Sequence, residues 1–334
     1  MIIVRAPMRI SFVGGGTDLA SFYRHYPGRV ISTAINKYSY VSINQPPLIK
    51  KISVRYAISE LVDHPNELKH NRIRAALLNL GIESRIDIGC FSDLPVKSGL
   101  GSSSSFTAAL IKGLYAYIDK KIDKQELAEA AAKLEIEHLK EPIGKQDHYA
   151  AVFGGFNIFQ FNPDESVDVM PIHLDFKKRL SFENHLLIFF TGITRSASDI
   201  LTEQKSKTGQ NIEVMKKMSD SVFDFRDKLV AGDFKTLGEI LREGWSRKKT
   251  LASNLSNPII DDIYNEGIKC GAWGGKILGA GGGGCILFIA PTEKKNTIRE
   301  SLKSIAKKHN LLDFNEIPIS FVQTGAEILM NSNY

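Results

Sequence analysis

The chain has 334 residues, 43% of them hydrophobic and 24% charged, and its 43 Lys and Arg against 37 Asp and Glu give a net charge of +6. This length usually forms two domains, and the composition is ordinary for a globular protein with a substantial core. The positive charge is spread without a polybasic block, so it gives little support to nucleic-acid binding. Three widely separated cysteines, Cys90, Cys270 and Cys285, indicate buried free thiols rather than disulfides. No segment reaches transmembrane length, so we expect a cytoplasmic protein without a membrane anchor.

The N-terminal apolar run, residues 2–13, predicts a pair of strands interrupted near Pro7, because proline cannot donate a hydrogen bond to a central ladder. Residues 14–18 (Gly-Gly-Gly-Thr-Asp) follow it. Their glycines permit close approach of a ligand, and Thr17 and Asp18 carry groups that can hold sugar hydroxyls. The alternative is a plain loop in which Asp18 caps a helix running through Tyr23.

Several β-rich runs between residues 29 and 57 predict a twisted antiparallel sheet. A helix over residues 68–80 with one apolar face should end at Gly81, and a strand at residues 85–91 should follow. The first third of the chain is therefore expected to be mainly sheet, with helices covering one side.

Residues 94–110 contain two glycines, Gly99 and Gly101, and four consecutive serines, between the strand at 85–91 and a helix with apolar residues at helical spacing. Glycines let the backbone approach a ligand, and the first turn of a helix offers free N–H groups to an anion. The segment therefore predicts a nucleotide-phosphate site. The alternative is a flexible linker, but a linker needs no apolar periodicity at both of its ends.

Asp123 and Glu126 form a predicted capping box for a helix that runs to about residue 139, with Leu127, Ala131, Leu134 and His138 on its buried face. Near its end, Glu135 and Glu137 are either solvated surface residues or a metal ligand. The proline-containing turn at residues 142–148 holds Asp147, whose carboxylate can orient or deprotonate an attacking hydroxyl there.

The best positions for a domain boundary are the charged segments at residues 162–168 and 175–181. A buried strand over 186–190 is followed by Arg195, which either binds a substrate phosphate or faces solvent. Three amphipathic helices are predicted next, over residues 212–229, 234–245 and 259–268.

The second glycine-rich segment, residues 279–284, satisfies G-x-G-x-x-G but is followed by a strand rather than a helix, which excludes the dinucleotide-binding interpretation. The segment instead predicts a hairpin whose tip passes close to a ligand or another loop. A helix over residues 292–309 and a last strand over 317–322 would complete a ferredoxin-like half.

Three motifs together resemble those of the GHMP kinase superfamily of galacto-, homoserine, mevalonate and phosphomevalonate kinases. They are residues 6–18, residues 95–104 and residues 276–284, in family order. The resemblance implies an α+β fold with two domains, a ribosomal-protein-like domain over residues 1–180 and a ferredoxin-like domain over 181–334. Walker A and protein-kinase motifs are absent, which argues against those kinase classes.

Within the superfamily, residues 8–18, 142–147 and 191–197 look most like those of bacterial heptose 7-phosphate kinases, which phosphorylate the anomeric hydroxyl of the heptose with ATP. Galactokinases carry Gly-Glu-His-Thr-Asp where this chain has Gly14-Gly-Gly-Thr-Asp18, which argues against galactose. His148 stands where the family pattern has Gln.

By this resemblance, Asp147 faces the acceptor hydroxyl and Arg9 stabilises the developing charge. Mg²⁺ would be held by Ser103 and by Glu135, whose offset from the turn matches galactokinases; Glu137 is the alternative. The residues implied to bind the ATP phosphates are Lys97, Ser98, Gly99, Leu100, Gly101, Ser102, Ser103 and Ser104. Those implied to bind the sugar are Gly15, Gly16, Thr17, Asp18, Gln146, Arg195, Gly281 and Gly282.

The resemblance leaves three alternatives to a heptose kinase: a fucokinase- or galactokinase-like sugar 1-kinase, a non-catalytic regulator with this fold, and an RNA-binding protein. Asp147, Arg9 and the intact serine segment argue against the regulator. The expected partner is a small-molecule sugar phosphate, with neither nucleic acid nor membrane, and the protein is expected to be a monomer or a homodimer.

Overall fold

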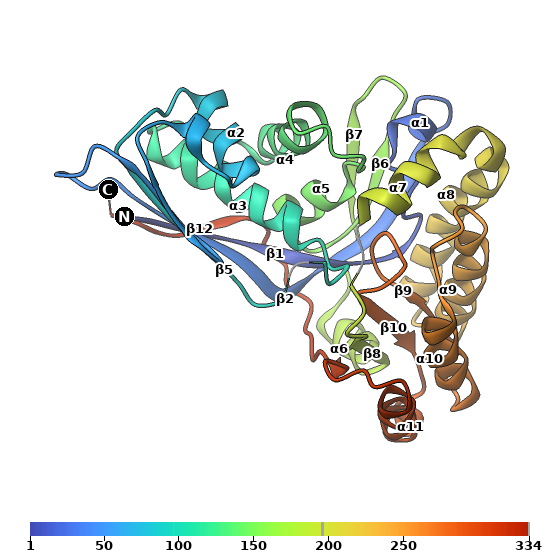
Figure 1. The fold of residues 1–334 in the computed structure, drawn as a ribbon. Coiled ribbons are helices and arrows are strands. Elements are labelled where there is room, and N and C mark those ends of the chain that lie inside the picture. The colour runs from blue at the N-terminus through green and yellow to red at the C-terminus, as the bar shows by residue number, and fades with distance from the viewer. Residues whose placement is uncertain (96, 195–196, 333–334) are drawn as a thin grey trace.

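The structure is a computed structural model that describes residues 1–95, 97–194 and 197–332. Within this part of the chain, two sheets and the helices packed on them form the fold (Figure 1). The larger sheet has the order β12-β1-β2-β5-β3-β4, and β6 pairs with both β2 and β7. Its strands are β1 (Ile2–Val13), β2 (Gly28–Asn44), β3 (Ile52–Arg55), β4 (Ser59–Val62), β5 (Ile86–Ser92), β6 (Phe156–Phe161), β7 (Val167–Pro171) and β12 (Glu327–Asn331).

Residues 2–13 form one continuous strand, β1, so the predicted strand pair is wrong. β1 runs antiparallel to β2 along its whole length, and the register shifts between Pro7 and Met8. On its other side β12 pairs only as far as Arg5. Pro7 therefore lies at a bulge and beyond the end of β12, where a missing backbone N–H is tolerated.

One face of the larger sheet is covered by helices, as expected (Figure 1). They are α2 (Asn71–Leu80), α3 (Ser102–Tyr117), α4 (Lys124–Lys133) and α5 (Gln146–Phe153). α2 ends at Gly81, as predicted, with this glycine in a left-handed conformation, and α4 begins with the predicted capping box of Asp123 and Glu126. A core of aliphatic side chains from β1, β2, β5 and α3 holds helices and sheet together.

The chain continues from α4 as one π-helical turn, η2 (Leu134–His138). The wider turn shifts the angular position of every later side chain, so His138 is exposed and its predicted burial is wrong. Leu127, Ala131 and Leu134 are buried as predicted. Glu135 lies at helical spacing from the buried Ala128 and Ala131 and is itself fully buried, whereas Glu137 is exposed.

The second sheet has the order β11-β8-β10-β9. Its strands are β8 (Leu186–Phe190), β9 (Gly274–Ile277), β10 (Cys285–Ile289) and β11 (Asn315–Glu316). The predicted amphipathic helices are confirmed as α8 (Thr208–Ala231), α9 (Phe234–Lys249) and α10 (Pro258–Lys269). The other elements are α1 (Ala20–Tyr23), α6 (Phe176–Asn184), α7 (Ala197–Ser206), α11 (Lys295–Lys308) and two short 3-10 turns, η1 (Pro65–Glu67) and η3 (Thr292–Lys294).

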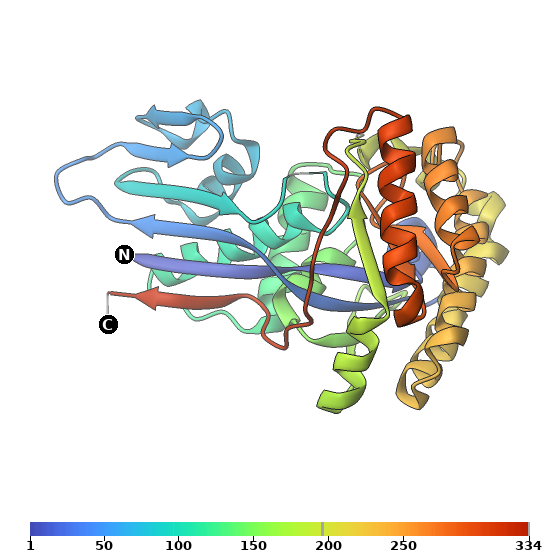
Figure 2. The ribbon, with the colours of Figure 1, turned by 90° about the horizontal axis from the view of Figure 1, so that it is seen from below.

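The predicted last strand, residues 317–322, is wrong. Regular pairing with β8 covers only Asn315 and Glu316, after which the backbone contacts both sheets: the N–H of Ile317 donates to Ile188, and that of Val322 donates to Ala34. This segment leads from the second sheet to β12, which lies beside β1 (Figure 2). The sequence-based division at residue 180 falls inside α6 and stays a prediction.

The three cysteines are free, as predicted, but only Cys285 is buried, and Cys90 and Cys270 are half-buried. Burial raises the pKa of Cys285 to about 12. None of the helices in the described part of the chain combines the length and apolar character needed to cross a bilayer.

Candidate active site

The Gly-Ser segment connects β5 to α3 and forms one wall of a cleft of about 230 Å³. Gly99 and Gly101 have positive φ angles of 80° and 76°, and Gly101 is the N-cap of α3. The residues of this segment that line the cleft are Lys97, Gly99, Gly101, Ser102, Ser103 and Ser104. Free N–H groups in the first turn of α3 therefore face a cavity lined with hydroxyls, the arrangement that binds phosphate.

Ser98 and Leu100 belong to this segment but are buried, and neither lines the cleft. The carbonyl of Ser98 accepts a 2.9 Å hydrogen bond from the N–H of Cys285, and that of Leu100 accepts one of 2.9 Å from the N–H of Arg9. These two residues fix the segment between β1 and β10. Their structure supports a positioning role rather than the predicted direct contact with phosphate.

The second glycine-rich segment is the tip of the β9–β10 hairpin, as predicted, and it packs against the Gly-Ser segment. A Cβ on Gly99 would lie 2.6 Å from the carbonyl oxygen of Leu278, so the close approach requires glycine. Gly279 and Ala280 line the cleft, whereas Gly281 and Gly282 do not. The N–H of Gly282 donates instead to the carbonyl of Leu255, 2.8 Å away.

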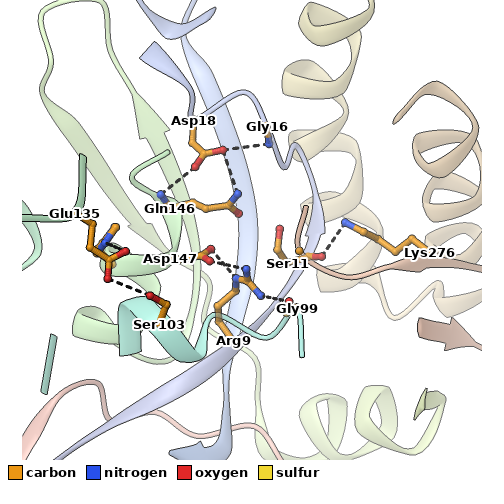
Figure 3. Close-up of polar contacts among 12 residues, drawn as sticks. Arg9, Ser11, Gly16, Asp18, Gly99, Ser103, Glu135, Gln146, Asp147 and Lys276 are labelled. Atoms are coloured by element: carbon orange, nitrogen blue, oxygen red, sulfur yellow. Dashed lines mark hydrogen bonds and ion pairs between the residues drawn. The ribbon is translucent and has the colours of Figure 1, made fainter. Parts of the chain in front are cut away.

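Arg9 on β1 and Asp147 in the first turn of α5 form a two-pronged ion pair at the base of the cleft (Figure 3). Nε of Arg9 donates to Oδ1 of Asp147 at 2.8 Å, and NH2 donates to Oδ2 at 2.7 Å. NH1 of Arg9 donates to the carbonyl of Gly99 at 2.7 Å. The arginine side chain is 4% exposed and the aspartate 25%, so Asp147 presents a carboxylate edge to the cleft while Arg9 ties it to the Gly-Ser segment.

Glu135 lines the cleft beside Ser103, whose hydroxyl lies 3.2 Å from its Oε1 (Figure 3). Thr107 also donates to Oε1, and Arg72 forms an ion pair of 3.0 Å with it. Burial alone would raise the pKa of Glu135, but His148, Arg72 and the hydrogen bonds outweigh burial and lower the pKa to about 2. Glu135 is therefore ionised at neutral pH.

A hydroxyl and an ionised carboxylate are oxygen ligands of the kind that Mg²⁺ prefers. Oε2 of Glu135 is buried, makes no hydrogen bond among the described residues and lies 3.3 Å from Nε2 of His148, so a hard cation would be held by Oε1 and the Ser103 hydroxyl beside it in the cleft. Nowhere in the described part of the chain do three or more His, Cys, Asp or Glu side chains gather as a metal site. The phosphates of a nucleotide would have to complete the coordination.

The loop at residues 14–18 lies at the other end of the cleft and is held by Asp18 and Thr17. Oδ1 of Asp18 accepts from the N–H of Gly16 at 3.1 Å and from Nε2 of Gln146 at 3.0 Å (Figure 3). Burial raises the pKa of Asp18, and the charge of Asp147 adds to the effect. The alternative of a helix cap is wrong, because Leu19 is the N-cap of α1 and no side chain bonds there.

Thr17 is fully buried, and its hydroxyl bonds to the backbone of Gly14 and Arg29. Of the predicted sugar-binding residues, Gly16, Asp18 and Gln146 line the cleft, while Gly15 and Thr17 lie behind it. Arg195 lies outside the described residues.

The sequence did not predict several of the cleft residues, among them Arg72, Leu201, Gln204 and Lys248. Lys248 on α9 is buried, and its Nζ donates to the carbonyl of Gly279 at 2.6 Å. Burial lowers the pKa of Lys248 to about 8, and the charge of Arg9 acts in the same direction. The signal for Lys248 was its position on the apolar stripe of α9, three residues after Trp245.

A second cavity of about 550 Å³ adjoins the first, and the two share Arg72, Lys97, Ser102, Ser103, Glu141 and Ser198. Its other walls include the rings of Tyr56, His70 and Phe106. Flat side chains next to the start of α3, where the sequence predicts a phosphate site, are suited to a nucleoside.

Two family profiles match the chain: the GHMP kinases N terminal domain over residues 70–155 and the GHMP kinases C terminal domain over residues 225–308. A D-glycero-alpha-D-manno-heptose 7-phosphate kinase from Campylobacter jejuni is 31% identical over 89% of this chain and 92% of its own length. An L-fucokinase/L-fucose-1-P guanylyltransferase from Bacteroides fragilis is 27% identical over 86% of this chain, which spans only 34% of that protein. A crystal structure of a D-glycero-D-manno-heptose 1-phosphate kinase from Bacteroides thetaiotaomicron shares the fold, with a TM-score of 0.81 and 24% identity over 99% of each chain.

Proposed function

The chain belongs to the GHMP kinase family, and from this premise we propose that it phosphorylates the anomeric (C1) hydroxyl of D-glycero-D-manno-heptose 7-phosphate with ATP. The product, the 1,7-bisphosphate, would supply nucleotide-activated heptose for surface polysaccharide. The predicted two-domain α+β fold of this family is confirmed. The observation that carries the proposal is the Arg9–Asp147 pair, anchored to Gly99 at the base of the cleft.

The nucleotide occupies the two adjoining cavities in this proposal. Its base and ribose lie among Tyr56, His70 and Phe106, and its phosphates lie at the start of α3. The N–H groups of the first helical turn and the hydroxyls of Ser102 and Ser103 bind phosphate oxygens. Lys97, exposed at the rim shared by both cavities, neutralises part of their charge.

Asp147 orients the acceptor hydroxyl and takes its proton. The C1 oxygen forms a bond to the γ-phosphorus, the bond from that phosphorus to the β,γ-bridging oxygen breaks, and ADP leaves with the electron pair. Arg9 holds both carboxylate oxygens of Asp147 in place, which limits the rotation of the acid. A positioned base of this kind contributes roughly 10²–10⁴ to the rate, and alignment and charge stabilisation supply the rest.

Ser103 and Glu135 would hold Mg²⁺ against the nucleotide phosphates. The ion supplies charge neutralisation on the phosphate oxygens when bound. Arg72 joins Glu135 and Glu141, with ion pairs of 3.0 and 3.2 Å, and so keeps the Glu135 carboxylate turned toward the serine hydroxyls.

The sugar lies between Asp147 and the loop at residues 14–18. Gly16, Asp18 and Gln146 form a hydrogen-bonded set on that side of the cleft and offer polar atoms to sugar hydroxyls. Because these residues lie next to Asp147, they would fix the position of the sugar relative to the Asp147 carboxylate.

A coupled assay of ADP release over a panel of sugars and sugar phosphates tests the proposal. We expect turnover with the heptose 7-phosphate, and a loss of at least ~10²-fold in kcat for Asp147→Asn. Turnover of free L-fucose or galactose in preference to the heptose 7-phosphate would instead identify a different sugar 1-kinase. Near-normal turnover by the Asp147→Asn variant would remove Asp147 from the mechanism.

A further inference from the structure

The side chain of Gln204 on α7 is a buried amide, and a buried amide ordinarily has hydrogen-bond partners. Its side chain is 1% exposed, and neither Nε2 nor Oε1 has a partner among the described residues. A buried amide without partners costs free energy. Since Gln204 lines the cleft, a molecule bound there can supply the missing hydrogen bonds.

The amide of Gln204 lies directly against the loop at residues 14–18. A Cβ built on Gly16 would be 2.3 Å from Nε2 of Gln204, so Gly16 leaves the room that this amide occupies. The N–H of Gly16 in turn donates to Asp18, which also accepts from Nε2 of Gln146. Gln204 therefore belongs to the same side of the cleft as Asp18 and Gln146.

Oε1 of Gln146 is a second buried amide atom without a partner in the described chain. Together the two glutamines offer one amide donor group and two acceptor oxygens to this side of the cleft. A molecule that satisfies them must carry several groups that both donate and accept, and hydroxyls do both.

The backbone of α7 is held in place independently of the amide. Thr208 donates its hydroxyl to the carbonyl of Gln204 at 3.1 Å, and its hydroxyl oxygen lies 2.9 Å from that of Ser21 in α1. Ile200, one turn earlier, is buried against Phe22 and Met215. The amide of Gln204 is thus positioned by packing, with its hydrogen-bonding capacity left free.

We propose that Gln204 determines substrate specificity by binding two neighbouring hydroxyls of the sugar, donating from Nε2 to one and accepting at Oε1 from the other. This inference rests on the proposed sugar kinase activity. A substrate that lacks one of these hydroxyls leaves the buried amide unpaired, and a site built in this way discriminates strongly against it.

The test compares Gln204→Leu with wild type. Leucine has a similar size and removes the unpaired amide, so thermal stability should be unchanged or higher, while KM for the sugar phosphate rises about 10- to 100-fold and KM for ATP is unchanged. Gln210→Leu, at an exposed position in α8, is the matched control and should alter neither constant. A fall in thermal stability with an unchanged KM for the sugar would assign Gln204 a merely structural role and overturn the proposal.

Monodeoxy analogues of the substrate provide the second readout. For wild type, kcat/KM should fall with each analogue that lacks a hydroxyl bound in the cleft. In Gln204→Leu, the fall should disappear for the one or two analogues that lack a hydroxyl bound by Gln204. Equal losses in both proteins at every position would also overturn the proposal. If wild type turns over no sugar at all, the proposed function fails and this inference with it; if wild type is active and the variant indistinguishable, only this inference fails.

Discussion

Nε2 of His148 lies 3.3 Å from Oε2 of Glu135, and both side chains are fully buried. His148 follows Asp147 in α5, and Glu135 lies in the π-helical turn after α4. The contact therefore connects the helix that carries the proposed catalytic base, Asp147, to the residue proposed to hold the metal.

The contact predicts how stability depends on acid pH. The pKa of Glu135 is lowered to about 2 in the folded protein, below its value of about 4.5 in an unfolded chain. Its stabilisation is fully present above pH 4.5 and is lost as pH falls through 2, a contribution on the order of 2–3 kcal/mol. The free energy of unfolding, measured with urea between pH 5 and 2, should depend less on pH for Glu135→Gln than for wild type. Identical slopes would contradict the pKa direction.

The Arg9–Asp147 pair predicts non-additive effects on catalysis. Arg9→Lys keeps a charge but loses the two-pronged contact, and we expect kcat to fall about 10- to 100-fold. Because Asp147→Asn disrupts the same unit, the double variant should be little worse than Asp147→Asn alone. Steady-state kinetics of the four proteins measures this coupling. Effects that multiply would indicate that Arg9 and Asp147 act separately.

The hairpin against the Gly-Ser segment predicts that Gly99→Ala impairs ATP binding. The new methyl group would lie 2.6 Å from the carbonyl oxygen of Leu278, and the alanine backbone would have to adopt a φ of 80°. The free energy of unfolding should therefore fall by more than about 1–2 kcal/mol, and KM for ATP should rise. Gly232 has nearly the same φ, 79°, with open space around it. Gly232→Ala is therefore a control for backbone strain alone, and an equal loss of stability in both variants would exclude the steric clash.

The lowered pKa of Lys248 predicts that the free energy of unfolding increases at alkaline pH. Its pKa is lowered by burial to about 8, whereas an unfolded lysine titrates near 10.5. Between these values the unfolded chain binds the proton and the folded protein does not, so stability rises with pH across that window, by up to about 3 kcal/mol. Wild type should gain this stability relative to Lys248→Met. The exposed neighbour Lys249, changed to Met, should leave the curve parallel to wild type.

Local patterns were sufficient for much of the fold and for part of the site. Apolar periodicity predicted α8, α9 and α10, and the glycines predicted a hairpin tip that passes close to another loop. The phosphate-binding role of the Gly-Ser segment stays a prediction. The choice of Glu135 over Glu137 came from the resemblance, and the structure buries Glu135 and exposes Glu137. The π-helical turn, which no periodicity indicated, is why His138 is exposed.

The sequence failed to predict Lys248 and Gln204 in the cleft for one physical reason. Lys248 and Gln204 are polar residues whose burial depends on contacts between distant segments, with Gly279 and Gly16 respectively. Residue type alone places both on the surface, and only tertiary packing reverses that expectation. The last strand was misplaced for a similar cause, since β12 is defined by its partner, β1, more than 300 residues away in the sequence.

The pairing of β12 with β1 also bears on synthesis. Residues 2–5 leave the ribosome well before their second strand partner, residues 327–331, because more than 300 residues separate the two strands. Until then the outer edge of β1 carries unpaired N–H and C=O groups that can bind a strand of another nascent chain. While the intervening segment is being translated, this open edge is therefore available for aggregation with another chain.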